Sequence, residues 1–204
     1  GDNAIARTVT MASNSTINAN AGSKLTLNAG ITDGAATYSL TKIGDGTLSI
    51  NGSSNYGGAT TVNGGTLQLA GTGGALTATS GITVVGGEFR MDNSAGNNNT
   101  RVGNSTGISL SDGALTFIGN TAGNSTETVG NLTLSAGANT LNLATGAANR
   151  TADLTLGDII RNGTATLLIN AYSDAAMTTR ANVGQGGDWD EIVPAVQAAA
   201  AEHL

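Results

Sequence analysis

The sequence contains no cysteine, only one proline and few aromatic residues. The absence of cysteine excludes a disulfide framework and a zinc site with thiolate ligands. Aromatic residues make up 3% of the 204 residues, whereas hydrophobic residues make up 39%. Compact globular domains bury more large aromatic side chains, so this composition favours a thin core of Leu, Ile, Val and Ala. Because proline blocks strand pairing, its near absence leaves almost every position free to join a sheet.

Charge is also scarce. Charged residues make up 11% of the chain, the formal net charge is −6, and the eight Lys and Arg residues are scattered between Arg7 and Arg180. No basic face forms, so we predict no nucleic-acid partner. No apolar run approaches the length of a transmembrane helix, and we expect no membrane insertion of this segment.

The sequence instead repeats one phrase, a small or glycine-containing turn followed by apolar-x-apolar, as in TVNGGTLQLAG at residues 61–71. Between the first members of successive pairs the spacings are 23, 19, 22, 26, 26 and 26 residues, which indicates a repeat protein. The pairs are Leu25/Leu27, Leu48/Ile50, Leu67/Leu69, Phe89/Met91, Leu115/Phe117, Leu141/Leu143 and Leu167/Ile169.

Each repeat has a second apolar arm upstream of its turn. Val62, Val84 and Leu110 each precede the next pair by five residues, since 67−62, 89−84 and 115−110 are all 5. Ile43 fits the same offset to Leu48, while the unit after Leu134 stretches it to seven.

Alternation with a period of two predicts strands with one buried face, and Gly-Gly or Asp-Gly predicts tight corners. Hairpins would also explain such turns, but an array of hairpins leaves exposed strand edges. Coiling the chain lets each strand pair above and below. The sequence therefore predicts an all-β fold, a single-stranded parallel β-helix of roughly eight or nine rungs.

Residues Leu40 to Leu67 carry a denser pattern, LTKIGDGTLSINGSSNYGGATTVNGGTL, which resembles the passenger-associated transport repeat of bacterial autotransporters. The resemblance implies a right-handed coil in the secreted passenger of a surface protein, and a role in moving that passenger across the outer membrane. The fourteen matching positions are Lys42, Gly44, Gly46, Thr47, Leu48, Gly52, Asn55, Tyr56, Gly58, Thr60, Val62, Gly65, Thr66 and Leu67.

Parallel β-helices also include polysaccharide-degrading enzymes, which need paired carboxylates. Asp45 and Asp112 hold equivalent positions, three residues before Leu48 and Leu115, but three rungs or roughly 14 Å would separate them. We interpret both as corner residues, because Asp before Gly favours turns.

Other reactive groups are isolated. His203 is the only histidine and stands next to the last residue, while Arg90 and Glu88 face outward on a strand with no calcium-binding acids nearby. The repeat GDGTL at residues 44–48 is a single copy of a calcium-binding pattern that requires several. We therefore predict no catalytic, cofactor-binding or metal-binding residues, and no enzyme activity.

Two further features have simple interpretations. DWDE at residues 188–191 suits calcium or carbohydrate binding, but an end cap in which Trp189 covers the last rung explains it as well. Asn-x-Ser/Thr triplets at Asn14, Asn104, Asn124 and Asn162 are expected by chance in this composition.

The composition changes after Gly187, where apolar residues take a helix-like spacing. We predict a β-helix over residues 1–187 and a short C-terminal helix or cap over 188–204. The first rung has no comparable cap, since strand-like alternation begins at Val9 and Met11. Head-to-tail pairing of rungs from different molecules would then build fibres.

These observations favour a non-enzymatic structural segment of a secreted or surface-displayed bacterial protein, acting as a stalk, spacer or fibre unit. The alternative is an adhesin-type module that binds a glycan or host surface through outward Thr, Asn and Ser rows. A polysaccharide-degrading enzyme is the third interpretation. The expected location is extracellular or on the outer-membrane surface.

Overall fold

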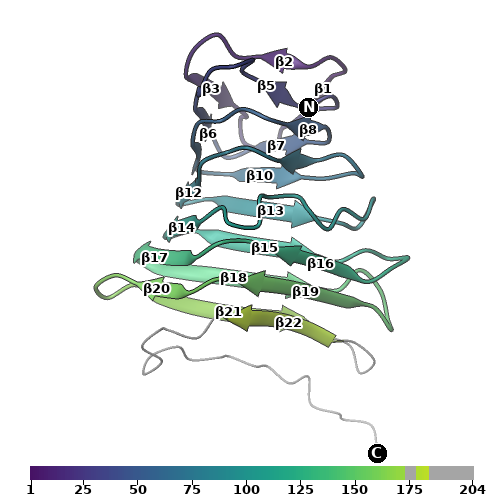
Figure 1. Cartoon of the computed structure of the whole chain (residues 1–204), viewed down its shortest axis with the longest axis vertical. Coiled ribbons are helices and arrows are strands. Elements are labelled where there is room, and N and C mark those ends of the chain that lie inside the picture. Colours follow the sequence, from purple (N-terminus) through teal and green to yellow (C-terminus); the bar gives the residue numbers. More distant parts are fainter. Residues whose placement is uncertain (173–177, 184–204) are drawn as a thin grey trace, which may run out of the picture.

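The computed structural model describes residues 1–172 and 178–183, which form parallel β-strands and, over these residues, no helix. Each strand pairs with the strand one full turn later, and every pairing is parallel: Leu67 lies beside Leu48 on one side and Phe89 on the other. The chain is therefore a β-solenoid, and its strands lie one above another along a single stack (Figure 1). This confirms the predicted parallel β-helix.

The main sheet contains eight strands in sequence order, so seven intervals, or about seven full turns, separate the first from the last. The predicted eight or nine rungs are close to this number. Its strands are β1 (Asp2–Ile5), β4 (Lys24–Leu27), β7 (Thr47–Ile50), β10 (Thr66–Leu69), β13 (Glu88–Asp92), β15 (Ala114–Ile118), β18 (Ala138–Ala144) and β21 (Thr166–Tyr172).

A second sheet of seven strands forms another side of the coil. Its strands are β3 (Ser15–Asn18), β6 (Leu40–Ile43), β9 (Thr60–Asn63), β12 (Ile82–Val85), β14 (Ile108–Ser111), β17 (Leu132–Ala136) and β20 (Ile159–Arg161).

Shorter sheets form the third side, which the chain visits between the main sheet and the second sheet. They pair β2 (Val9–Thr10) with β5 (Ile31–Thr32), β8 (Ser53–Ser54) with β11 (Ala75–Leu76), and β16 (Ser125–Thr128) with β19 (Thr151–Leu156) and β22 (Thr178–Val183).

The alternating apolar residues fill the interior, as the sequence predicts. Leu48, Leu67 and Phe89 stack in one buried column, and each is fully excluded from solvent. Every rung contributes only a few such side chains, so stability comes from stacking rungs rather than from one thick core.

Two sequence assignments are wrong in register. Ile43 is 37% exposed, and Lys42 takes the inward position beside Val62. The corner after β6 has three residues where the next has two, so the expected five-residue offset does not apply there.

The last repeat is also displaced. Leu141 pairs with Ile169 rather than with Leu167, a spacing of 169−141, or 28 residues. Leu167 lies beside Asn139 and is still buried, because β18 and β21 are long enough to add an inward position. The predicted cap over residues 188–204, and the boundary at 187, lie outside the described residues.

Candidate functional site

The most specific sequence motif, residues 40–67, contains a lysine inside the coil. Lys42 is fully buried and its Nζ donates hydrogen bonds to the carbonyl oxygens of Ile43 at 3.3 Å, Gly64 at 3.1 Å and Gly44. Burial lowers the pKa of Lys42, and the charge of Asp45 partly opposes this effect. The ammonium group thus links the corners of two consecutive rungs, whose carbonyls would otherwise face an apolar interior.

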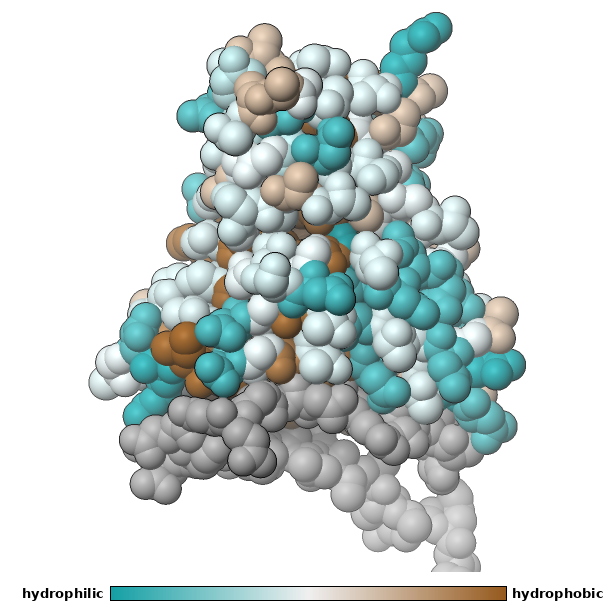
Figure 2. Space-filling model, in the orientation of Figure 1, coloured by the Kyte–Doolittle hydropathy of each residue, from teal (hydrophilic) through white to brown (hydrophobic). Residues whose placement is uncertain are grey.

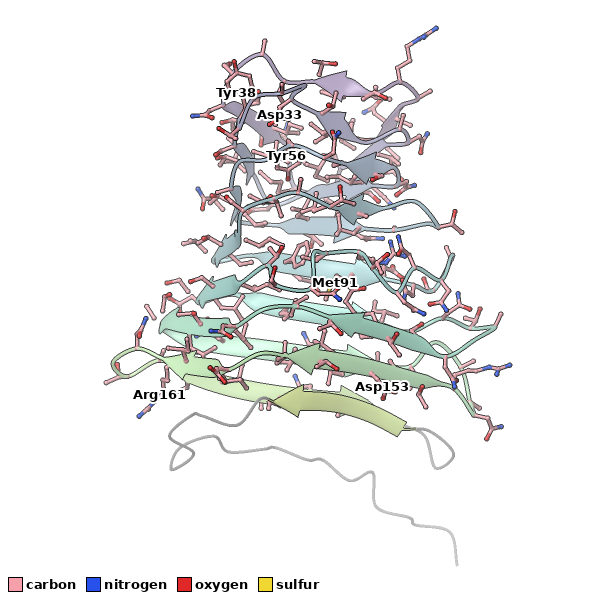
Figure 3. All side chains as sticks on the ribbon, viewed as in Figure 1. Asp33, Tyr38, Tyr56, Met91, Asp153 and Arg161 are labelled. Atoms are coloured by element: carbon pink, nitrogen blue, oxygen red, sulfur yellow. The ribbon has the colours of Figure 1, made fainter. Side chains whose placement is uncertain are left out.

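A buried chain of hydroxyl groups crosses the same motif. The Tyr56 hydroxyl is hydrogen-bonded to Thr60 Oγ1 at 2.7 Å, and Thr60 Oγ1 is hydrogen-bonded to Thr79 Oγ1 at 2.9 Å. Thr79 in turn donates to the carbonyl of Gly58 at 2.9 Å. Burial raises the pKa of Tyr56 above its usual value, so this phenol stays neutral. Figure 3 shows Tyr56 within the stack, close to Asp33 and Tyr38 of the preceding turn.

Two glycines of the motif are required by close approach between rungs. A Cβ at Gly58 would lie 2.4 Å from the backbone carbonyl group of Tyr38, and one at Gly52 would lie 2.4 Å from the carbonyl carbon of Ala29. Contacts this short do not occur between real atoms, so neither position accepts a side chain without movement of the backbone.

A second buried polar centre surrounds Arg101, in the loop between β13 and β14. The guanidinium donates to Asn93 Oδ1 at 2.6 Å and to the carbonyl oxygens of Gly71, Gly74, Asp92 and Gly96 at 2.7–2.9 Å. The side chain is fully buried, and burial lowers its pKa to about 10 against the opposing charges of Glu127 and Asp92. The Arg101 side chain thereby joins the loops of two consecutive turns, residues 71–74 and 92–96.

Glu127 lies on the next turn and is 1% exposed. Its two carboxyl oxygens accept the backbone N–H groups of Arg101 at 3.0 Å and Val102 at 2.9 Å. Burial raises the pKa of Glu127 to about 7, although these two bonds and the charge of Arg101 favour the ionised form. The carboxyl group therefore titrates near neutral pH within the core.

This raised pKa predicts a pH-dependent stability. The folded pKa of about 7 exceeds the ordinary value of 4.5, so the folded state retains a proton that the unfolded chain releases. The contribution of Glu127 is fully present below pH 4.5 and is lost as pH rises through 7, a change of about 3 kcal/mol. Urea unfolding of the wild type and Glu127→Gln across this range measures it. The wild type should lose stability relative to the variant with rising pH, and parallel curves would contradict the prediction.

The outer face of the main sheet carries a connected polar row. Glu88 accepts hydrogen bonds from Arg90 at 2.6 and 3.1 Å, from Thr66 at 3.1 Å and from Thr116 at 2.6 Å. The row continues because Asn142 donates to Thr116 and Asn170 donates to Asn142. Arg90 and Glu88, predicted to be outward and solvated, are outward but partly buried and paired with each other. Their hydrogen-bonding groups are already used within the protein.

The other residues that the sequence singled out as candidates do not form a site. Asp45 is an exposed corner residue, and Asp112 sits in a corner with φ of 52°, where its Oδ1 accepts the N–H of Ala138 at 3.0 Å. Asn14, Asn104, Asn124 and Asn162 are exposed. Residues 188–191 and His203 lie outside the described residues.

Over the described ranges, no three His, Cys, Asp or Glu side chains are grouped as metal ligands. In the same part of the chain, no helix has the length and hydrophobicity needed to cross a membrane.

Two hollows lie beside the strands of the second sheet, one where that sheet meets β16 and β19 and the other along β12, β14, β17 and β20. One has a volume of about 560 Å³ and the other about 360 Å³, and both are lined by Gly107 and Asn131, where they meet. We call the joined hollows the corner groove. Figure 2 shows the side of the molecule that carries β16 and β19, where a few apolar atoms are visible between mostly polar surfaces.

The polar residues that line the corner groove are neutral. They are Ser80, Thr83, Asn104, Ser105, Ser109, Thr128, Asn131, Thr133 and Thr155.

Sequence reasoning missed the buried charges. The alternation Leu40-x-Lys42 places Lys42 on the inward face, and this pattern would have identified it. Arg101 and Glu127 gave no comparable signal, because the loop before β14 has no repeat periodicity and the burial of Glu127 depends on the adjacent turn.

The geometry defines the class of the protein as a parallel β-solenoid whose interior is linked by a few buried polar side chains. Residues 40–69 match the family model of the passenger-associated transport repeat. The chain therefore contains this repeat of autotransporter passengers, as residues 40–67 predict. Neither curated proteins nor solved structures gave a significant match to the chain.

Proposed function

We propose that this chain is a non-enzymatic structural segment of a secreted or surface-displayed bacterial protein, serving as a stalk, spacer or fibre unit. One observation carries the proposal: the large side chains of the transport-repeat motif are buried and contact other parts of the coil. Lys42 and Tyr56 are buried and bonded to groups of the coil, while Leu48, Val62 and Leu67 pack in its core. A motif used for a reaction would instead present reactive groups to solvent.

The family match supports the location. Passenger repeats belong to secreted proteins, so the segment would be displayed outside the cell or on the outer-membrane surface. Antibodies raised against these 204 residues test this on the bacterium that makes the protein. We expect labelling of intact cells and loss of the signal after protease treatment from outside. Labelling that requires permeabilised cells would contradict the proposal.

As a fibre unit, the segment would pair end to end with other copies of itself. β1 is the edge strand of the main sheet, and all four of its residues are exposed. An edge strand offers unpaired backbone groups to another chain. Electron microscopy across a concentration series distinguishes the two forms, since end-to-end pairing gives long uniform fibres and a spacer gives isolated short rods.

A second candidate function is an adhesin-type module that binds a glycan. The observation that favours it is the row of outward hydroxyl groups on the second sheet, on successive strands: Thr16, Thr41, Thr61, Thr83, Ser109 and Thr133. A glycan array probed with the purified chain tests this function, and selective binding that outward substitutions abolish would support it.

Enzyme activity is tested separately, by incubating the chain with neutral and acidic polysaccharides with and without calcium. The proposal predicts no product release. Release of oligosaccharides would contradict it.

A further inference from the structure

We propose that the corner groove, together with the adjacent hydroxyl row, binds a neutral polysaccharide chain that lies along the solenoid axis. The proposal rests on the second candidate function and gives it a site and a ligand class.

Three outward threonines of the second sheet have uncommitted hydroxyl groups, in contrast to the outward hydroxyls of the main sheet. Ser109 differs from them, because its Oγ is hydrogen-bonded to Ser135 Oγ at 2.7 Å. Within the described residues, the side-chain oxygens of Thr61, Thr83 and Thr133 have no hydrogen-bond partner, whereas Thr66 and Thr116 are bonded to Glu88. The polar side chains on the outer face of the main sheet thus form hydrogen bonds with one another. The row on the second sheet offers donors and acceptors to a ligand.

The row is regular because parallel strands stack at a constant distance. Thr61, Thr83, Ser109 and Thr133 are register partners on consecutive strands, so their side chains repeat at about 4.8 Å. A polymer with hydroxyl groups on every unit suits such a ladder, since it can form one or more hydrogen bonds at each rung.

The groove beside the row is open because small residues form its floor. A Cβ placed on Gly81 would have one neighbour, at 3.8 Å, and one on Gly107 would have one neighbour, at 3.6 Å. These distances are ordinary contacts, and neither residue has a positive φ. The backbone therefore tolerates larger side chains there, unlike Gly58 and Gly52, and such side chains would reduce the open space of the hollow.

The chemistry of the walls selects the ligand. The residues that line the two hollows carry no charge, which disfavours an acidic polysaccharide or a charged peptide. An extended peptide would normally be held by an open strand edge, but β12 and β14 are paired on both sides. A neutral, hydroxyl-rich chain needs neither charge nor a free strand edge.

Binding is tested with the purified chain and neutral glucose oligosaccharides of increasing length, measured by calorimetry or by NMR shifts. Acidic oligogalacturonates serve as the charged comparison. We expect binding to the neutral series that strengthens with length and then levels off when the groove is filled. No binding to the neutral series, or stronger binding to oligogalacturonates or an extended peptide, would overturn the proposal.

Two sets of variants locate the site. Filling the floor with Gly81→Gln and Gly107→Gln should weaken binding at least tenfold, as should removal of hydroxyls with Thr83→Val and Thr133→Val. The matched control is Gly123→Gln, because a Cβ there also meets a single neighbour, at 3.8 Å, and lies outside the two hollows. Circular dichroism and the urea midpoint should stay unchanged in all of them. Binding that survives the filled floor would contradict the site, even where surface labelling upholds the spacer function.

Discussion

Replacing Arg101 by methionine is expected to lower the free energy of unfolding by about 3–5 kcal/mol, because removing one member of a buried polar network leaves the others unsatisfied. Five oxygen atoms accept hydrogen bonds from this guanidinium, and four of them are backbone carbonyls to which a methionine side chain offers no donor. The urea midpoint, followed by circular dichroism, measures the loss.

Two comparison variants separate this effect from a general loss of charge. Arg90→Met removes an arginine whose partner Glu88 lies on the outer surface, and exposed ion pairs contribute about 0–1 kcal/mol. Arg101→Lys keeps the charge but lacks the planar fork that reaches several carbonyls, so it should resemble Arg101→Met. Equal midpoints for Arg90→Met and Arg101→Met would show that the Arg101 network does not stabilise the coil.

Substitution of Gly58 by alanine should cost about 3 kcal/mol, the upper end of the penalty for overpacking. The new Cβ would lie 2.4 Å from the Tyr38 backbone, and neither rung can move without breaking its hydrogen bonds to the next. Thermal unfolding of the variant, compared with the wild type, measures the cost.

Gly107→Ala is the matched control for this prediction. The distance from its Cβ to the nearest neighbour is 3.6 Å, and alanine restricts the unfolded chain, so the change should be neutral or stabilising by up to about 1 kcal/mol. Equal unfolding temperatures for Gly58→Ala and Gly107→Ala would contradict the close approach of rungs at Gly58.

The fold was predictable because one repeated pattern dictates it. The apolar-x-apolar pairs at Leu48/Ile50 and Leu67/Leu69 lie in register, as equivalent positions of a coil must. Spacing alone did not fix the register at the corners. An extra residue in Gly44-Asp45-Gly46 moves Lys42 inward in place of Ile43, and a buried lysine contradicts the usual preference of that position for apolar residues.

The interior polar groups were less predictable than the strands. Arg101 is buried because loop carbonyls from different turns converge on it, and those carbonyls belong to residues that carry no distinctive side chain. The corner groove was equally hard to predict, since the open space at Gly81 and Gly107 depends on the distance from each glycine to the neighbouring turn. Both features arise from contacts between turns, which a single repeat unit does not encode.

A stalk or spacer requires rigid, regular stacking of rungs, and distances between pairs of spin labels measure this stacking. Because the chain has no cysteine, one label site at Thr16→Cys can be combined with Thr83→Cys, Ser109→Cys or Thr133→Cys without background labelling. These partners are three, four and five strand spacings away, so we predict narrow distributions near ~14, ~19 and ~24 Å. Broad distributions, or distances that do not increase by one strand spacing per rung, would contradict the solenoid and the spacer function built on it.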